Sequence, residues 1–204
     1  MRARHKKWAA PYLDAHPEFY LHHIEPNDPF FLASPLYLEI GSGKGDFIVG
    51  MASKHHGHYL ALEREISVLG TLGKKLEESG LGNVKVIGAD FDDAYEELKE
   101  YRFDAIYLNF SDPWPKKKHW KRRLTTSDRL AKMASLLKDD GRFIIKTDNE
   151  GLYAFTIEQA VLASLTIESA NEDYLFDEGN DAMSEYERNF RSQGMKIHRI
   201  ALHK

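Results

Sequence analysis

The sequence contains no cysteine among its 204 residues. This absence excludes disulfides, thiolate zinc sites and cysteine nucleophiles, including any enzyme that must form a cysteine adduct with a pyrimidine ring. Long apolar runs are also missing: a typical run, residues 160–163, has four residues, so no segment is expected to span a bilayer. No apolar stretch follows the basic N-terminus. We therefore expect no signal peptide and a cytoplasmic protein.

Positive charge is scarce outside two short segments. The chain has 28 lysines and arginines against 32 acidic residues, a net charge of −4. Residues 1–7 and 116–123 hold ten of the basic residues and no acid, so the other 189 positions carry −14. This distribution favours a polyanionic partner such as nucleic acid, bound at a defined place, although two solvated surface runs would give the same count.

Proline is concentrated at the start of the chain, where five of the seven lie within residues 1–35. Because dense proline interrupts helices and central strands, residues 1–35 are expected to form an irregular arm, with aromatic side chains that pack partly on the body. Residues 36–204 have the size of a single domain. Hydrophobic residues make up 42% of the chain, enough for a core.

From residue 36 onward, apolar runs of strand length alternate with helical periodicity. Helices are expected from residue 46, over 66–79, 94–101 and 152–165, and after a basic loop at 111–125. The expected strands are 36–40, 59–62, 84–87, 103–110, 142–146, 166–176 and 196–202. This order predicts an α/β fold with a mainly parallel sheet covered by helices on both faces. Such sheets bind ligands at the carboxyl ends of their strands.

A glycine-rich turn follows the first of these strands, in the segment Leu-Glu-Ile-Gly-Ser-Gly-Lys-Gly at 38–45. Gly41, Gly43 and Gly45 permit a tight turn and the close approach of a ligand to the backbone. The third glycine comes one residue too early for the dinucleotide pattern. Glu39 would repel a pyrophosphate but would stabilise the ammonium of S-adenosylmethionine. The predicted ligand is a positively charged nucleoside without phosphate.

Two further acids follow the next two strands. Glu63 stands where Rossmann-type folds place an acceptor for ribose hydroxyls, and Asp90 is placed to meet an adenine edge. Either residue alone would be read as an ordinary solvated acid. With Glu39 they are three acids at three successive strand ends, which predicts a cofactor site.

The segment Ser-Asp-Pro-Trp-Pro-Lys-Lys-Lys-His-Trp-Lys-Arg-Arg at 111–123 follows the fourth strand. The carboxylate of Asp112 is able to accept hydrogen bonds from N1–H and the 2-amino group of guanine. Trp114 is a candidate to stack on an extruded base, and the cations that follow are candidates to hold phosphates. A solvated turn would explain the prolines but not the adjacent acid and tryptophan.

These two motifs, with Ser-Glu-Tyr-Glu at 184–187, resemble the bacterial tRNA (guanine-N7-)-methyltransferase family from about residue 36 to the end. The resemblance implies a class I S-adenosylmethionine-dependent methyltransferase (Rossmann-like) fold. It also implies methyl transfer from S-adenosylmethionine to N7 of guanosine 46 in the variable loop of tRNA, with Asp112 at the catalytic centre. The cofactor-binding residues that it implies are Glu39, Gly41, Gly43, Gly45, Glu63, Asp90 and Asp112.

The resemblance also implies residues that contact the nucleic acid. The implied substrate-binding residues are Lys116, Asp148, Ser184, Glu185, Tyr186 and Glu187. The implied RNA-contacting residues are Lys118, His119, Trp120, Lys121, Arg122 and Arg123. The chain departs from the family pattern at Ser111, Trp120 and Ser184, where many members have proline, histidine and threonine. Considered without the family, Ser184 and Glu187 also match a helix capping box.

Guanine N7 carries an in-plane lone pair and no proton, so the reaction needs no general base. Asp112 is expected to act as a guanine-edge acceptor and electrostatic stabiliser, with Asp148 as a second acceptor at the same rim. The histidines at 55, 56 and 58 have no acid at ligand spacing, so no metal is predicted. The expected partner is tRNA, and the chain is expected to be a monomer or a homodimer.

Three alternatives stay open at this point. The pattern Ser111-x-Pro113-Trp114 loosely fits methyltransferases that act on the amino group of adenine, but that class lacks the basic run. A non-catalytic RNA-binding protein would share the basic run and would not bind the cofactor. A nicotinamide dehydrogenase is disfavoured by the glycine spacing and by the carboxylate at 39.

Overall fold

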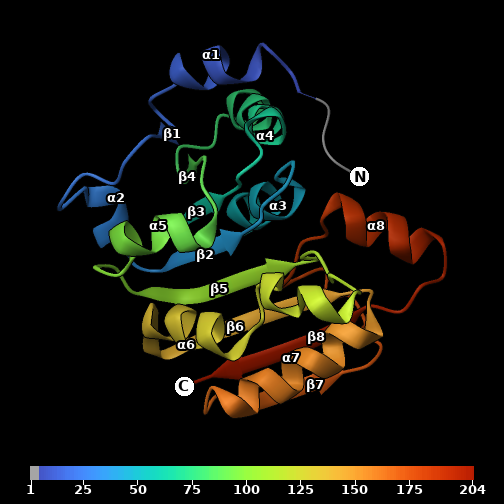
Figure 1. The fold of residues 1–204 in the computed structure, drawn as a ribbon. Helices are drawn as coiled ribbons and strands as arrows, with labels where there is room; N and C mark the ends of the chain where they lie inside the picture. The colour runs from blue at the N-terminus through green and yellow to red at the C-terminus, as the bar shows by residue number, and fades with distance from the viewer. Residues whose placement is uncertain (1–4) are drawn as a thin grey trace.

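A computed structural model describes residues 5–204 and, within them, every side chain except that of Lys117. Its centre is a sheet of eight strands in the order β1-β4-β3-β2-β5-β6-β8-β7 (Figure 1). The first six of these are parallel, and β8 runs antiparallel to both β6 and β7. The strands are β1 (Tyr20–Leu21), β2 (Leu36–Ile40), β3 (His58–Leu62), β4 (Val84–Ile87), β5 (Phe103–Asn109), β6 (Leu137–Thr147), β7 (Thr166–Asn171) and β8 (His198–His203).

Helices cover both faces of the sheet, and each face has its own apolar cluster. One cluster packs α3 and α4 against β3 and β4, and the other packs α5, α6 and α7 against the centre of the sheet. The helices are α1 (Ala9–Asp14), α2 (Pro29–Leu32), α3 (Asp46–Lys54), α4 (Ile66–Ser79), α5 (Phe91–Leu98), the 3-10 helix η1 (Lys117–Arg122), α6 (Ser127–Ser135), α7 (Glu150–Leu162) and α8 (Glu185–Ser192). The predicted α/β architecture is confirmed.

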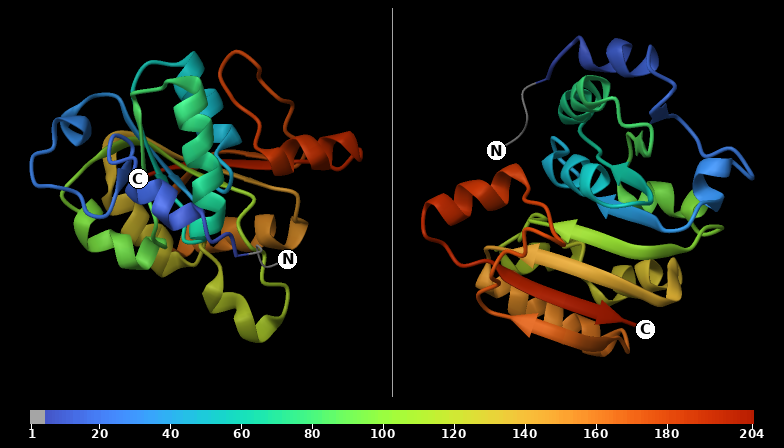
Figure 2. Two further views of the ribbon diagram at one scale, coloured as in Figure 1. Left: turned by 90° about the horizontal axis from the view of Figure 1, so that it is seen from above. Right: turned by 180° about the vertical axis from the view of Figure 1, so that it is seen from behind.

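The chain order reverses direction between β2 and β5, at the middle of the sheet. From β2 the chain proceeds outward to β3 and β4, whereas from β5 it proceeds the other way to β6. A parallel sheet opens a crevice at such a switch point, beyond the carboxyl ends of the two central strands. The glycine turn follows β2 and Asp112 follows β5, so both predicted motifs lie at this crevice. Seen from above in Figure 2 (left), α8 lies at the right of the view and η1 at the bottom, well apart from it.

The N-terminal arm is more ordered than the proline content predicts. It contains α1, α2 and β1, and Tyr20 of β1 pairs in parallel with Val86 at the edge of the sheet. Leu13 and Phe19 are buried in the cluster beneath α4. Prolines are tolerated here because Pro11 and Pro29 lie in the first turns of their helices, where the missing N–H has no partner in any case.

Several predicted boundaries shift for local reasons. Helix α5 begins at 91 rather than 94, because the side chain of Asp90 caps it by accepting from the backbone N–H of Asp93. Strand β6 begins at 137 rather than 142, while β7 ends at 171 rather than 176. The basic loop contains η1, which its charge pattern did not reveal.

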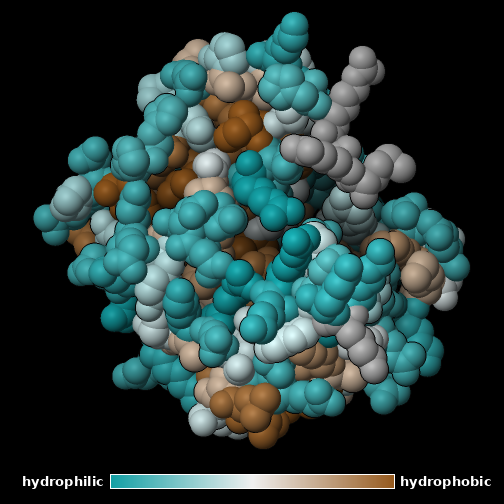
Figure 3. All heavy atoms as spheres, in the orientation of Figure 1, coloured by the Kyte–Doolittle hydropathy of each residue, from teal (hydrophilic) through white to brown (hydrophobic). Residues whose placement is uncertain are grey.

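The surface seen in Figure 3 is mostly hydrophilic, with an apolar patch at its lower edge over the end of α7. Val161 and Leu162 at this end of α7 are largely exposed. Within residues 5–204, none of the helices combines the length and apolar character needed to cross a membrane.

Candidate active site

The turn between β2 and α3 needs glycine at all three predicted positions. Gly41, Gly43 and Gly45 have φ angles of 76°, 56° and 80°, in the left-handed region that other residues rarely adopt. A Cβ on Gly45 would come within 2.0 Å of Leu72 Cδ1, so this glycine permits close packing of α3 on α4. A Cβ on Gly41 or Gly43 would meet nothing within 4 Å. Those two positions therefore border open space that a ligand can fill.

Glu39 lies directly beneath this turn and is 1% exposed. Its Oε1 accepts a hydrogen bond of 2.9 Å from Asn109 at the end of β5, while its Oε2 has no partner among the described residues. Burial raises the pKa of Glu39 to about 8, although the hydrogen bond from Asn109 and the charge of Lys146 act in the opposite direction. A buried carboxyl of this kind is costly unless a cation pairs with it.

Other polar atoms at the crevice are also unpaired. The atoms buried without a partner here are Glu39 Oε2, Ser42 Oγ and Asn109 Oδ1. Asn109 Oδ1 accepts hydrogen bonds only, and so does Glu39 Oε2 once this carboxyl is ionised, so the two suit a ligand that brings several N–H donors and positive charge. The amino group of S-adenosylmethionine has these properties, and the residues present fit this cofactor.

Glu63 and Asp90 lie at the carboxyl ends of β3 and β4, as predicted. The carboxylate of Glu63 accepts from the backbone N–H of Gly43 at 3.0 Å and from that of Glu65 at 2.9 Å, so it also holds the glycine turn in shape. Asp90 is exposed and caps α5. Both acids border the same crevice as Glu39, but capping alone already gives Asp90 a structural role.

Asp112 lies across the crevice from these acids, just after β5. Its side chain is 68% exposed, and its Oδ2 lies 3.7 Å from the guanidinium of Arg64, a weak pair at this exposure. Phe110 and Trp114 on either side have φ angles of 54° and 40°, which non-glycine residues seldom adopt. Backbone strain of this kind concentrates at functional sites. No pattern in the sequence predicts this strain.

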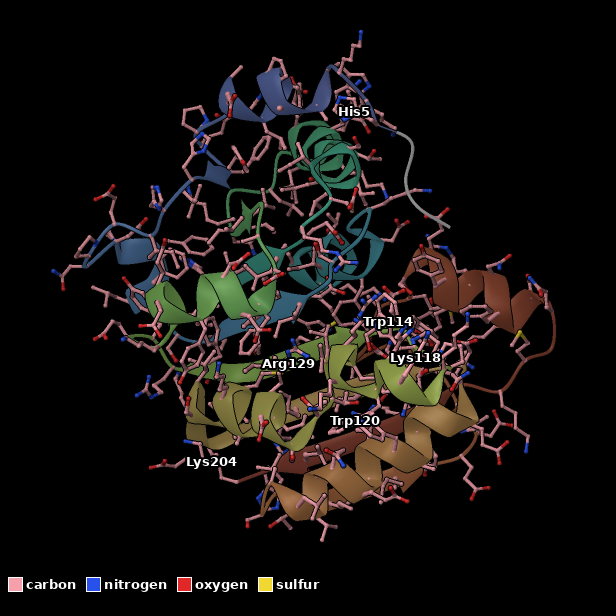
Figure 4. All side chains as sticks on the ribbon, viewed as in Figure 1. His5, Trp114, Lys118, Trp120, Arg129 and Lys204 are labelled. Atoms are coloured by element: carbon pink, nitrogen blue, oxygen red, sulfur yellow. The ribbon has the colours of Figure 1, made fainter. Side chains whose placement is uncertain are left out.

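The basic loop divides into anchoring and exposed residues. Arg123 anchors it: its side chain donates to the backbone oxygen of Pro113 at 2.8 Å and lies 4.4 Å from the ring centre of Phe155. Arg122 lies 4.9 Å above the ring of Trp114, so one face of that ring is already covered. The exposed residues that are turned outward on the loop are Lys116, Lys118, Trp120 and Lys121. Figure 4 shows Trp114, Lys118 and Trp120 together on the η1 loop.

Two aromatic residues of the loop, His119 and Trp120, pack against other aromatic rings. The ring of His119 meets that of Trp114 edge-on, with centroids 5.9 Å apart. Trp120 meets Phe155 of α7 in the same manner at 6.3 Å. The loop is therefore held against its surroundings by aromatic contacts, while Lys116, Lys118 and Lys121 are exposed to solvent.

The predicted substrate segment at 184–187 forms the beginning of α8. Ser184 caps the helix, since its hydroxyl accepts from the backbone N–H of Glu187, and Glu185 pairs with Lys44 of the glycine turn at 2.8 Å. Tyr186 is 58% exposed. Asp148 follows β6 at the same rim as Asp112.

Glu187 does not lie where a substrate contact is expected. Its side chain is fully buried, and its carboxylate binds Lys146 at 2.7 Å and Arg191 at 2.9 Å. Its side chain therefore has a structural role here, and the direct substrate contact implied by the resemblance stays a prediction. Lys146 and its partner Asp181 were not among the predicted site residues. The available signal was a single lysine within the apolar run of β6, Phe-Ile-Ile-Lys-Thr at 143–147.

Two hollows in the surface do not include the glycine turn. One of about 250 Å³ lies between the arm and α5, and one of about 500 Å³ lies against the sheet face near Tyr107 and Arg199. Neither is lined by Glu39, Gly43 or Glu63. The candidate site is instead placed by the strand order, at the carboxyl ends of β2 and β5.

Comparisons with known proteins agree with this geometry. A family model described as "Putative methyltransferase" matches residues 33–200. The chain is 39% identical over 206 residues to the tRNA (guanine-N(7)-)-methyltransferase of Staphylococcus aureus, covering 98% of this chain and 96% of that protein. It is 41% identical over 207 residues to the protein of the same name from Staphylococcus epidermidis, again covering 98% and 96%.

Solved structures show the same fold at low sequence identity. An antibiotic-related methyltransferase superposes with a TM-score of 0.66 and 19% identity, over 89% of this chain and 98% of the other. Fibrillarin from Aeropyrum pernix, solved with natively bound S-adenosyl-L-methionine, superposes with a TM-score of 0.55 and 15% identity, over 82% of this chain and 66% of the other. The predicted class I methyltransferase fold is confirmed.

Proposed function

The chain belongs to the tRNA (guanine-N7-)-methyltransferase family, and from this premise we propose that it methylates N7 of guanosine 46 in the variable loop of tRNA. The observation that carries the proposal is the pairing of two features across one crevice. On one side is the buried carboxyl of Glu39, with an unpaired oxygen beneath an open glycine turn. On the other side is Asp112, followed by the exposed Lys116, Lys118 and Lys121.

S-adenosylmethionine supplies the electrophilic methyl group when it is bound. Glu39 would pair with the ammonium of the cofactor, and Glu63 would accept from its ribose hydroxyls, exchanging the bonds that it now receives from Gly43 and Glu65. The glycine turn leaves room for the cofactor at Gly41 and Gly43. Asp90 is the candidate for the adenine edge.

The guanine needs orientation and negative charge rather than a base. N7 attacks with its own lone pair, and positive charge moves onto the purine as the methyl group is transferred. Asp112 and Asp148, at the ends of the neighbouring strands β5 and β6, would accept hydrogen bonds from the guanine edge and stabilise this charge. No proton is removed to start the reaction.

The basic loop would bind the RNA backbone. Lys116, Lys118 and Lys121 are exposed beside Asp112, where phosphates of the variable loop would approach. The target base has to leave its stack, at a cost of a few kcal/mol. Arg122 covers one face of Trp114, so stacking by this tryptophan would use its other face. A monomer or homodimer in the cytoplasm stays a prediction.

The experiment that tests the proposal maps the methylated atom and nucleotide together. The protein is incubated with S-adenosylmethionine labelled in the methyl group and an unmodified tRNA transcript, which is then treated with borohydride and aniline to cleave at N7-methylguanosine. The expected result is one cleavage at position 46, lost when guanosine 46 is replaced by adenosine. Cleavage elsewhere would contradict the position, and labelled tRNA without cleavage would contradict the atom.

A further inference from the structure

A buried cluster of charges joins strand β6 to the segment 172–192, which we call the strap. Lys146 is 1% exposed, and its ammonium contacts Asp181 at 3.0 Å, the backbone oxygen of Ala182 at 3.1 Å and Glu187 at 2.7 Å. It also lies 4.9 Å from the ring centre of Phe47 in α3. One lysine therefore fixes two separate points of the strap to the sheet.

The strap completes the cluster from its own side. Arg191 binds the other oxygen of Glu187 at 3.0 Å and donates to the backbone oxygen of Tyr174 at 2.9 Å. The hydroxyl of Tyr174 donates to Asp181 at 3.1 Å. With two acids and two cations, the cluster has no net charge. The contact between Arg191 and Tyr174 also joins the end of the strap to its beginning.

Beyond the cluster, α8 reaches the cofactor side of the crevice. Glu185 pairs with Lys44 in the glycine turn, and Arg188 pairs with Asp46 at the start of α3. Lys75 of α4 binds the same carboxylate. Although burial acts against it, these two cations hold the pKa of Asp46 below its ordinary value. A shift of α8 would therefore disturb contacts at the glycine turn as well as the place of Tyr186.

We propose that Lys146 is a positioning residue for methyl transfer, which holds α8 against the crevice so that Ser184, Glu185 and Tyr186 meet the tRNA. Glu187 acts through Lys146 and Arg191 and does not touch the substrate. This inference rests on the proposed function in that the positioned reaction is methyl transfer to tRNA. It does not depend on which guanosine receives the methyl group.

Stability alone is a poor explanation for this lysine. Removing a lysine from water is costly, and apolar residues of similar volume in place of a buried ion pair are often as stable or more so. The strand residues that precede Lys146, Phe143 and Ile145, are buried and apolar, so a methionine at this position continues their pattern. The lysine instead contributes specificity of position, because the hydrogen bonds from its ammonium fix Asp181, Ala182 and Glu187 of the strap relative to β6.

The test is a double-mutant cycle on kcat/KM for tRNA, with Lys146→Met, Glu187→Gln and the double variant. Each single substitution is expected to lower kcat/KM by about 10–100-fold, the range found for strongly coupled neighbours. The double variant should fall no further than the worse single, because both substitutions release the same helix. If the two losses multiply, Glu187 acts on the substrate independently and the proposal is overturned.

Two controls separate positioning from unfolding. Arg142→Met removes another cation of β6, whose partner Glu168 lies 2.7 Å away at the surface, and it should leave kcat/KM within about twofold. The affinity of Lys146→Met for S-adenosylmethionine should fall less than its kcat/KM for tRNA, because α8 reaches the glycine turn through the partly exposed pairs of Lys44 and Asp46, which contribute little. An equal loss of both would show general disruption and would contradict the proposal.

A measurement on the unaltered protein covers the case in which Lys146→Met does not fold. Hydrogen exchange should show the backbone amides of α8 protected in the protein without tRNA, since the cluster already holds the helix. Rapid exchange throughout α8 would overturn the proposal. If the proposed function is wrong, the unaltered protein will not methylate tRNA. If only this inference is wrong, the unaltered protein will methylate tRNA, and the losses of kcat/KM in the two single variants will multiply in the double variant.

Discussion

The two halves of the crevice are built in opposite ways. On the side of β2 and β3, Glu39 is buried, Glu63 is held by two backbone N–H groups, and the glycine turn has its final shape. On the side of β5, Asp112 is mostly exposed, and Lys116, Lys118 and Lys121 after it are exposed as well. The polar groups on the side of β2 and β3 are already in place for a small ligand. The charged groups on the side of β5 are exposed, as suits a large ligand.

This difference bears on how each half loses function. A buried group with one or two fixed partners contributes a large effect that no neighbour replaces. Exposed cations contribute to binding a polyanion through their sum, and each counts for little. Substitutions on the cofactor side should therefore act singly, and those on the basic loop should act in proportion to their number. Asp112 is an exception, because it is exposed like the basic loop but its substitution should have a large effect by itself.

The largest effect is expected from Asp112→Asn, which removes the charge that stabilises the purine as it becomes cationic. Turnover of bound tRNA should fall roughly 10²–10³-fold, while affinity for the cofactor changes little. Single-turnover methylation with saturating cofactor measures it, and Asp128→Asn, an exposed acid on α6, is the matched control. More than half the normal turnover in Asp112→Asn would remove this residue from its role.

Glu63→Ala should weaken cofactor binding by about 1.5–3 kcal/mol, or roughly 10–100-fold, through lost hydrogen bonds to a charged acceptor. Part of this loss would come from the glycine turn, because the backbone N–H of Gly43 also loses its acceptor. Calorimetric titration measures the effect, with the exposed Glu78→Ala on α4 as control. Unchanged cofactor affinity together with weakened tRNA binding would show that the two halves are not separate.

Lys118 and Lys121 provide the sharpest test of the exposed half. If both reach phosphates, replacing the two with alanine should flatten the plot of log K against log salt by roughly 1.4–1.8 units, since each contact contributes about 0.7–0.9. Arg123 is excluded from this pair because it anchors the loop.

The control replaces Lys132 and Lys196, two exposed lysines elsewhere, and should leave the slope unchanged. Residues 1–7 are the competing source of positive charge. A flattened slope after their deletion, with no change in the Lys118 and Lys121 variant, would place RNA binding on the arm instead of the loop.

The buried half should also have a cost in stability. The pKa of Glu39 is about 8 in the folded protein, against 4.5 for the free side chain, so between these values the folded state holds a proton that the unfolded state has lost. Stability from this group is complete below pH 4.5 and is lost as pH rises through 8. Glu39→Gln should therefore raise Tm by several degrees at pH 9 and change it little at pH 4. An equal change at both values would contradict the assignment.

The sequence predicted the fold well because its signals are local. The glycine turn, the alternation of strand and helix, and the acids at strand ends depend on short segments, and each lies where expected. The arm was predicted less well, because pairing of β1 with β4 joins residues 66 positions apart and leaves no local pattern. The same limit explains the early part of β6, which pairs with Phe103 of β5.

The candidate site was predicted unevenly for the same reason. Glu39, Glu63 and Asp112 follow from motif and position, and the structure brings them to one crevice. Glu187 looked like a substrate contact or a cap, whereas its burial follows from Lys146, 41 residues earlier in the chain. Arg123 looked like a phosphate ligand because charge patterning does not reveal which cation of a run turns back to the backbone.

The central claim is that Glu39 is buried in order to pair with a cationic cofactor, and the most direct test is the pH dependence of S-adenosylmethionine affinity between pH 6 and pH 7. In this range the α-amino group of the cofactor is still charged, while Glu39 is largely protonated and must release its proton on binding. The affinity should rise by about tenfold over this unit of pH, with net proton release seen by calorimetry in buffers of different ionisation enthalpy. In Glu39→Gln the dependence should vanish. Equal affinities of the unaltered protein at both pH values, without proton release, would contradict the claim.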